Sequence, residues 1–218
     1  MASKWHWLVP SGLIALSLVP VAAGSARLVQ LASGAPATAA NERFISTPLP
    51  VVLHVIGASV FCLLGALQFS TSLRRRAWHR RSGRVVVPAG VVAALSGLWM
   101  AVYYSLPASD NRVLEVVRLG VGIGMVTALA LAVGAVRRRD FVVHREWMMR
   151  GYALGIGAGT QVLTNLPWVL AFGTPSPMVR AGLMTAGWGI NLAVAEWFIR
   201  RARRSADAPP ALIPSLAP

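Results

Sequence analysis

Long apolar runs separated by short polar joins make up most of this chain. Six of the runs approach the roughly 20 residues that a helix needs to cross about 30 Å of hydrocarbon. They lie near residues 7–26, 49–71, 85–105, 113–136, 147–172 and 181–199. Lipid offers no hydrogen bonds to the backbone, and the alternating pattern of a barrel strand is absent. The pattern therefore predicts an all-α integral membrane protein built as a bundle of six transmembrane helices.

The joins between the runs differ in charge from one side to the other. One set is rich in cations: Lys4, Arg74, Arg75, Arg76, Arg80, Arg81, Arg84, Arg137, Arg138, Arg139, Arg145, Arg200, Arg201, Arg203 and Arg204. The opposite joins hold only Arg27, Arg43, Arg112 and Arg180. Because cytoplasmic loops carry an excess of Lys and Arg, both the N and the C terminus are expected to be cytoplasmic.

The first run has a second interpretation. Lys4, an apolar segment and the small residues "VAAGSA" (21–26) also resemble a cleaved signal peptide, although the segment is long for such a core. Cleavage would leave the orientation of the other runs unchanged. We expect residues 1–204 to form a single polytopic membrane domain, with a polar external loop at 27–48. The proline-rich segment 205–218 is expected to be a disordered cytoplasmic tail.

Composition agrees with a membrane protein and excludes several other classes. Of 218 residues, 56% are hydrophobic and 13% are charged, and the mean hydropathy is +0.60. The formal charge of +14 does not indicate nucleic-acid binding, since the basic residues cluster between apolar runs rather than on a soluble face. Cys62 is the single cysteine, so an intramolecular disulfide, an Fe–S cluster and a thiolate zinc site are excluded.

Ionisable or amide side chains inside the runs form an outer layer near the sparsely charged joins. This layer contains His54, Glu115, Arg118, Gln161 and Asn165. Such groups are costly in lipid and need partners. Glu115 and Arg118 lie three residues apart on one helical face, which favours an ion pair between them. His54 is expected to be a hydrogen-bonded structural histidine.

An inner layer near the cationic joins contains Gln68, His79, His144, Arg150 and Glu196. The segments "HRRSGR" (79–84) and "HREWMMR" (144–150) both place His and Arg just before an apolar run. Their two imidazoles are therefore expected at the same depth, where a shared ligand could bind. Neutral imidazole is a good axial ligand for haem iron, and interfacial arginines pair with propionates. The candidate propionate contacts are Arg80, Arg84, Arg145 and Arg150.

The same residues allow two other interpretations. His-Arg pairs at an interface can anchor the loops to anionic headgroups, with Trp78 and Trp147 as interfacial aromatic residues. Asp140 and Glu146 could add oxygen ligands for zinc or another metal, but the spacing matches no standard zinc pattern.

Glycines recur every four residues at Gly151, Gly155 and Gly159, and again at Gly120 and Gly124. Small residues let helices approach closely, which is the favoured explanation. The same absence of side chains could also leave room for a flat porphyrin.

Three segments resemble a known family, the bacterial predicted membrane proteins called domain of unknown function 2306. They are "LHVIGASVFCLLGALQF" (53–69), "HRRSGRVVV" (79–87) and "HREWMMRGYAL" (144–154). The resemblance covers roughly residues 45–200. It implies a multi-pass protein of the bacterial cytoplasmic membrane and no established activity. The chain departs from the family at "GIGAGTQVL" (155–163), where a further arginine is expected.

A shorter similarity is to transmembrane b-type di-haem cytochromes, in which a histidine-glycine segment enters a helix that ends near a glutamine. His54 with Gln68, and His79 with Gly83, resemble those segments. Two complete bis-histidine sites cannot be built here, because the fourth and sixth runs contain no histidine. His79 and His144 are the better pair, since His54 belongs to the opposite layer.

Two hypotheses follow for function. In the first, one b-type haem at the cytoplasmic side transfers electrons, with a quinone or a redox partner protein. In the second, the protein is a non-enzymatic small-solute transporter or partner subunit, whose helices could be broken at Pro88 and Pro167. No nucleophile elbow, phosphate loop or paired carboxylate motif indicates a hydrolase or transferase.

Overall fold

The computed structural model describes residues 7–74 and 77–207, and all regular structure in these ranges is helical. Lys4, His6, Arg75, Arg76 and the expected tail from residue 208 onward lie outside the described residues. The helices are α1 (Leu8–Ala32), α2 (Glu42–Ser46), α3 (Pro48–Leu67), α4 (Thr71–Arg74), α5 (Ala77–Tyr103), α6 (Arg112–Arg137), α7 (Phe141–Gly155), α8 (Gly157–Phe172) and α9 (Pro177–Asp207).

Four of these helices, α1, α3, α5 and α6, are long and apolar enough to cross a membrane. Much of their apolar surface is exposed, as at Leu53, Leu95 and Ile123, where lipid is the natural solvent. The chain is therefore an all-helical, multi-pass membrane protein in a lipid bilayer environment.

The fifth and sixth apolar runs take less regular forms. The run 147–172 is covered by two helices, because α7 ends at Gly155 and α8 begins at Gly157, with Ile156 between them. The expected break positions, Pro88 and Pro167, are wrong, since both prolines lie inside continuous helices. The run 181–199 lies within α9, whose 31 residues extend to Asp207.

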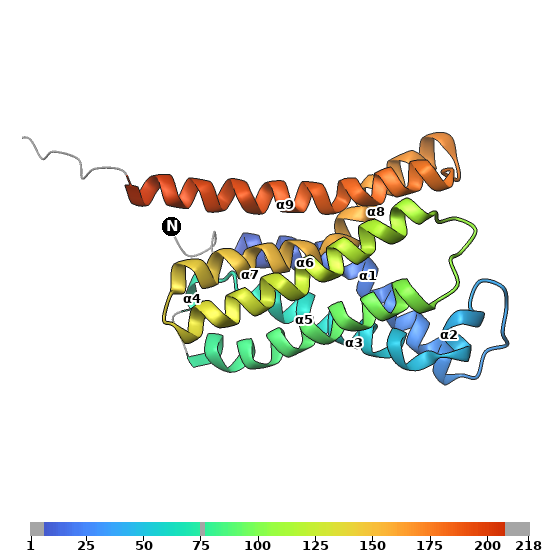
Figure 1. Cartoon of the computed structure of the whole chain (residues 1–218), viewed down its shortest axis with the longest axis horizontal. Helices are drawn as coiled ribbons and strands as arrows, with labels where there is room; N and C mark the ends of the chain where they lie inside the picture. The colour runs from blue at the N-terminus through green and yellow to red at the C-terminus, as the bar shows by residue number, and fades with distance from the viewer. Residues whose placement is uncertain (1–6, 75–76, 208–218) are drawn as a thin grey trace, which may run out of the picture.

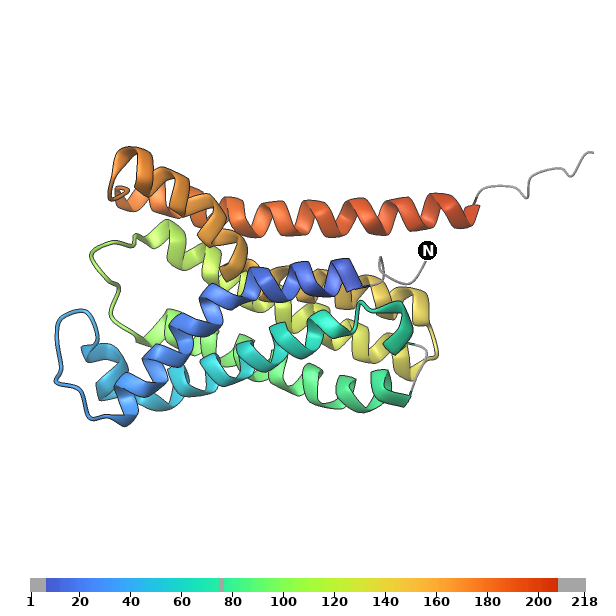
Figure 2. The same cartoon turned by 180° about the vertical axis from the view of Figure 1, so that it is seen from behind.

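The helices run back and forth along one long axis, so their connections gather at two ends (Figure 1). One end, here called the basic end, holds the start of α1, the α3–α5 and α6–α7 connections and the end of α9. The other, the mouth end, holds the segments 33–47, 104–111 and 173–176. The arginine-rich joins thus lie together, as far as they are described. Figure 2 shows α1 crossing the rear face with a bend midway, the region that contains Pro20.

The core sits where α3, α5, α6 and α7 meet, around the fully buried Phe61. The Phe61 ring lies against Gly90 of α5 and Gly155 of α7, where a Cβ would come within 2.5 Å of it. Tyr152 packs beside it with ring centroids 5.6 Å apart, and its hydroxyl donates to the Cys62 carbonyl oxygen at 2.8 Å. Glycines therefore admit one large aromatic ring between three helices.

Candidate functional site

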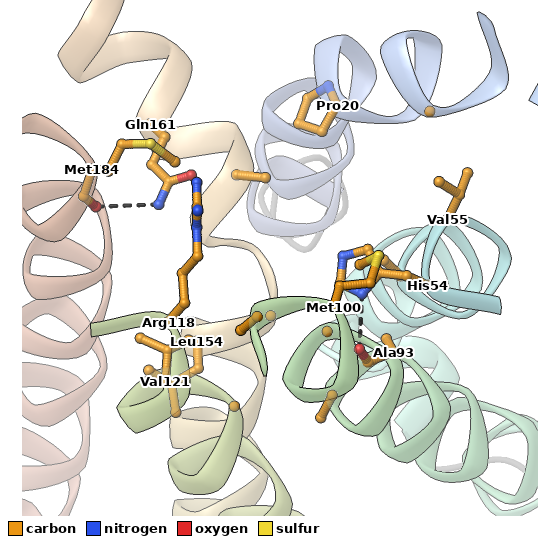
Figure 3. Close-up of a pocket in the computed structure, with 18 of the residues that line it drawn as sticks. Pro20, His54, Val55, Ala93, Met100, Arg118, Val121, Leu154, Gln161 and Met184 are labelled. Atoms are coloured by element: carbon orange, nitrogen blue, oxygen red, sulfur yellow. Dashed lines mark hydrogen bonds between the residues drawn. The ribbon is translucent and has the colours of Figure 1, made fainter. Parts of the chain in front are cut away.

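The structure contains a cavity of about 540 Å³, part of whose lining is drawn in Figure 3. Its lining includes residues of the mouth-end segments as well as Phe61 of the core. Residues of α1, α2, α3, α5, α6, α7, α8 and α9 line it, together with the 104–111 segment. Its size falls within the roughly 300–1,000 Å³ of small-molecule sites. The break between α7 and α8 forms part of the wall, since Gly155, Ile156 and Ala158 all line the cavity.

The cavity wall is largely apolar. Phe61, Val121, Met125 and Leu154 form its inner part, and Trp188 of α9 lies against it. Binding sites commonly combine such walls with a few well-placed polar groups that orient the ligand. Here the polar groups come from α3, from α8 and from the mouth end.

His54 is the polar group on the α3 side. Its Nδ1 lies 2.8 Å from the Ala93 carbonyl oxygen, and Gly97 leaves room for the ring. A carbonyl only accepts, so Nδ1 carries the proton and the neutral ring keeps a lone pair on Nε2. The histidine is thus hydrogen-bonded to the protein and still offers the cavity an acceptor.

Gln161 and Arg118 occupy the opposite side of the cavity (Figure 3). The buried Gln161 amide donates from Nε2 to the Met184 carbonyl oxygen at 3.1 Å, which joins α8 to α9. Arg118 extends from α6 toward the same side. An apolar space with polar groups on two facing walls can hold an elongated amphipathic molecule.

Asp110 organises the charges at the mouth. Its carboxylate lies 2.7 Å from Nη1 of Arg118 and 2.9 Å from Nε of Arg180, and 2% of its side chain is exposed. Burial alone would raise the pKa of Asp110. The hydrogen bonds and positive charges of Arg180 and Arg118 outweigh burial and hold the pKa below its ordinary value. The carboxylate therefore connects the loop to α6 and α9, an arrangement here called the mouth clamp (Asp110, Arg118, Arg180).

A third arginine, Arg43, also lines the cavity mouth. Burial lowers its pKa most; Asp110 raises it, and the neighbouring Arg118 and Arg27 lower it. Glu115 contributes little compensation, since it pairs with the exposed Arg112 at 2.9 Å. Glu115 also lines the cavity, so two carboxylates face three arginines there, and the lining keeps a net positive charge.

The expected ion pair between Glu115 and Arg118 is wrong, because Arg118 pairs with Asp110 instead. Glu115 lies one turn from Arg112 at the start of α6 and pairs with it there. Arg118 meets Asp110 because the 104–111 segment folds back over the cavity, a long-range feature that local spacing does not report.

The inner-layer residues Arg150 and Glu196 form an ion pair between α7 and α9. Arg150 donates to Glu196 at 2.5 and 3.1 Å, and Arg203 donates to the buried Glu146 at 2.6 and 2.5 Å. Arg150 also stacks on Trp147, 4.7 Å from the ring centroid. This set of four charged residues is the basic-end ladder. Arg150 is one of the four candidate propionate contacts, and in this structure its guanidinium binds the Glu196 carboxylate.

The histidines expected to share a ligand both lie at the basic end, His79 near the start of α5 and His144 near the start of α7. His144 Nδ1 lies 2.9 Å from the Ala132 carbonyl oxygen of α6. Arg80, Arg84 and Arg145 are exposed. Gln68 donates to the Ser82 hydroxyl at 2.8 Å, which joins the end of α3 to α5. Within the described ranges, no group of three or more His, Cys, Asp or Glu side chains could hold a metal ion.

Three residues of the site, Asp110, Arg180 and Arg43, were not predicted from the sequence. A signal was available for Asp110, because "ASDNR" (108–112) places an acidic residue directly before the Asn that caps α6. The Asn111 side chain accepts from the Leu114 amide at 3.0 Å and so fixes where the helix begins.

The family described as Predicted membrane protein (DUF2306) matches residues 51–199, which include α5 to α8 and most of α3 and α9. No curated protein matches the chain, and no solved structure does. By this match over more than half of its length, the chain belongs to the family of predicted membrane proteins with a domain of unknown function, DUF2306.

Proposed function

We propose that the protein is a membrane carrier for a small organic solute, with the mouth-end cavity as its binding site. The observation that carries this proposal is the break between α7 and α8 at the cavity wall. Transporters typically bind their substrates at discontinuous helices, because irregular backbone is tolerated in a membrane where it lines a cavity.

The proposed topology follows from the distribution of charge. The pass α7–α8 completes six crossings, with both termini in the cytoplasm and the mouth end facing outward. The described arginine-rich joins share one end of the bundle, which supports this orientation under the positive-inside rule. For a bacterial protein, the resident membrane would be the cytoplasmic one.

Two clusters of ion pairs are suited to act as gates. The mouth clamp joins α6 and α9 through Asp110, and the basic-end ladder joins α7 and α9 through Glu146 and Glu196. A carrier must open one side while the other is closed. Movement of α9 against α6 and α7 would break the ion pairs of one cluster while those of the other stay formed.

Cysteine accessibility tests the proposal, because Cys62 is the single native cysteine. In a Cys62→Ala background, Ala158→Cys places a thiol in the cavity, and Leu170→Cys places one on the exposed apolar face of α8. We expect a membrane-impermeant methanethiosulfonate to modify residue 158 from the mouth side in sealed, oriented vesicles.

In vesicles of the opposite orientation, the reagent reaches the protein from the basic end, and the thiol at residue 158 should react more slowly. Glu196→Gln weakens the basic-end ladder and should therefore raise the rate of this reaction from the basic end. The Leu170→Cys control should stay unreactive from both sides. Reaction from one side only, unchanged by Glu196→Gln, would contradict a carrier and leave a one-sided binding protein.

A second proposal is one b-type haem at the basic end, with His79 and His144 as axial ligands and a quinone or redox protein as electron partner. One observation favours it. His144 Nδ1 contacts a backbone carbonyl, and such a contact commonly orients metal-binding histidines and leaves Nε2 as the ligand atom.

An absorption spectrum tests the haem proposal. Protein purified from haem-supplied cells should show a Soret band that shifts on dithionite reduction and disappears in His144→Ala. Colourless wild-type protein would overturn it without affecting the carrier proposal, since the two sites lie at opposite ends.

A further inference from the structure

The mouth-end cavity has a polarity that narrows the class of molecule it can hold. Its inner part is apolar, from Phe61 and Met125 to Trp188, while its mouth carries Arg43, Arg118 and Arg180. A ligand that matches both parts has a compact apolar body and one charged end. The sign of that charge follows from the groups at the mouth.

The arginines of the mouth clamp retain donors that the protein does not use. Arg118 contacts Asp110 through Nη1, and Arg180 contacts it through Nε. Their side chains are 31% and 33% exposed, and both line the cavity. Each guanidinium has five N–H groups, and the contact with Asp110 uses only part of them, so donors remain for a ligand in the cavity.

Charge balance favours an anion at this point. Asp110 is the one carboxylate bound to Arg118 or Arg180 among residues 7–74 and 77–207. Glu115 lines the cavity as well, but its charge is paired with Arg112, which lies outside the lining. Arg43 adds a third positive charge. Guanidinium groups bind carboxylate, sulfonate and phosphate oxygens through paired N–H donors, and these contacts strengthen in a partly desolvated site.

We infer that the cavity binds an amphipathic organic anion, whose acidic group contacts Arg118, Arg180 and Arg43 while its apolar body extends toward Phe61 and Met125. This assignment names the substrate class of the proposed carrier and rests on the cavity being its binding site. Cations are excluded from the mouth by the three arginines, and a neutral apolar molecule leaves those charges unmatched.

Trp188 provides a direct optical readout, because its indole lies against the cavity and brominated compounds quench tryptophan fluorescence on contact. The probe is 4-bromobenzenesulfonate, which is permanently anionic, and its matched cation is 4-bromobenzyltrimethylammonium. Full-length protein in nanodiscs of zwitterionic lipid avoids competition from anionic headgroups. We expect saturable quenching by the sulfonate, absent in Trp188→Phe, and no saturable quenching by the cation.

Charge variants identify where the anion binds. Arg118→Gln should weaken sulfonate binding at least tenfold. Arg27→Gln is the matched control, since it removes the same charge at the same end from a residue that does not line the cavity, and it leaves the Glu115–Arg112 pair intact. It should change the affinity less than twofold. Arg43→Gln removes a cation that takes no part in the ion pairs of the described residues, so it should weaken binding severalfold, and it keeps the test valid if Arg118→Gln fails to fold.

Absence of saturable quenching in wild type, equal quenching by the cation, or unchanged affinity in both Arg118→Gln and Arg43→Gln would overturn the anion assignment. Failure of the anion assignment and failure of the carrier proposal give different results. Sulfonate binding with one-sided cysteine reactivity keeps the anion site and rejects transport, whereas two-sided reactivity without sulfonate binding keeps the carrier and rejects this substrate class.

Discussion

At the scale of single residues, Asp110 determines the arrangement of the mouth end. Its carboxylate is almost fully buried, yet both of its oxygens contact arginines that come from other helices. A buried carboxylate with charged partners is costly to remove, because the partners then lose compensation for their desolvation. Stability and cavity geometry should therefore depend on the same side chain.

Replacement of this carboxylate tests that dependence. Asp110→Asn should destabilise the folded protein by about 2 kcal/mol, since Arg118 and Arg180 lose a charged acceptor. Thermal unfolding in nanodiscs measures the change. Glu115→Gln is the control, because it removes only a pair with the exposed Arg112 and should cost less than about 0.5 kcal/mol. Equal effects of the two variants would contradict a special role for Asp110.

The pH dependence of stability follows from the lowered pKa of Asp110. A carboxyl whose pKa is lower in the folded state stabilises the fold above its unfolded pKa, about 3.9 for Asp, and loses this contribution as pH falls further. The difference in Tm between wild type and Asp110→Asn should stay constant from pH 8 to about pH 5. It should shrink below about pH 4. A difference that vanishes near pH 6 would show that another group titrates.

The polar residues within the apolar runs were identifiable from the sequence, because polar side chains are rare and costly in membrane-spanning segments. His54, Gln161 and Arg118 do line one cavity. Their partners were not identifiable, since Asp110 and Arg180 lie in different polar joins and meet only when α6 and α9 pack. The expected Glu115–Arg118 pair failed for the same reason: spacing along one helix reports local neighbours only.

At the scale of elements, the break between α7 and α8 was not predicted. The transporter hypothesis offered Pro88 and Pro167 as places for breaks, but both prolines stay within helices. The break instead lies between Gly155 and Gly157, which are pressed against Phe61 and Trp188. Close packing on both sides of Ile156 accompanies this break. Hydropathy does not report packing between distant helices, so the position of the break could not be predicted from it.

Glycine packing near the break can be tested at Gly159. A Cβ there would lie 2.2 Å from the Leu16 carbonyl oxygen of α1, so Gly159→Ala must push two backbones apart. We expect a loss of about 1–3 kcal/mol, measured as a lower Tm.

Gly120→Ala serves as its control, since nothing lies within 4 Å of the added methyl group. It should be neutral or slightly stabilising, because alanine favours helix more than glycine does. A tolerated Gly159→Ala would contradict close contact between α1 and α8.

At the scale of the whole molecule, hydropathy predicted an all-helical multi-pass protein and located its apolar runs, because lipid imposes a simple length rule on each crossing. The basic end could also be anticipated from arginine clusters. The cavity could not, since eight helices from all parts of the chain build its wall. The carrier proposal therefore depends on tertiary structure, and its strongest consequence is that the two ends open in turn.

Distance measurements between spin labels at the basic end test that consequence most directly. In the Cys62→Ala background, Arg81→Cys on α5 and Arg200→Cys on α9 place labels on exposed positions of two passes. Double electron–electron resonance should give two populations of distances, and 4-bromobenzenesulfonate should change their ratio. A single narrow population, the same with and without the sulfonate, would contradict alternating access.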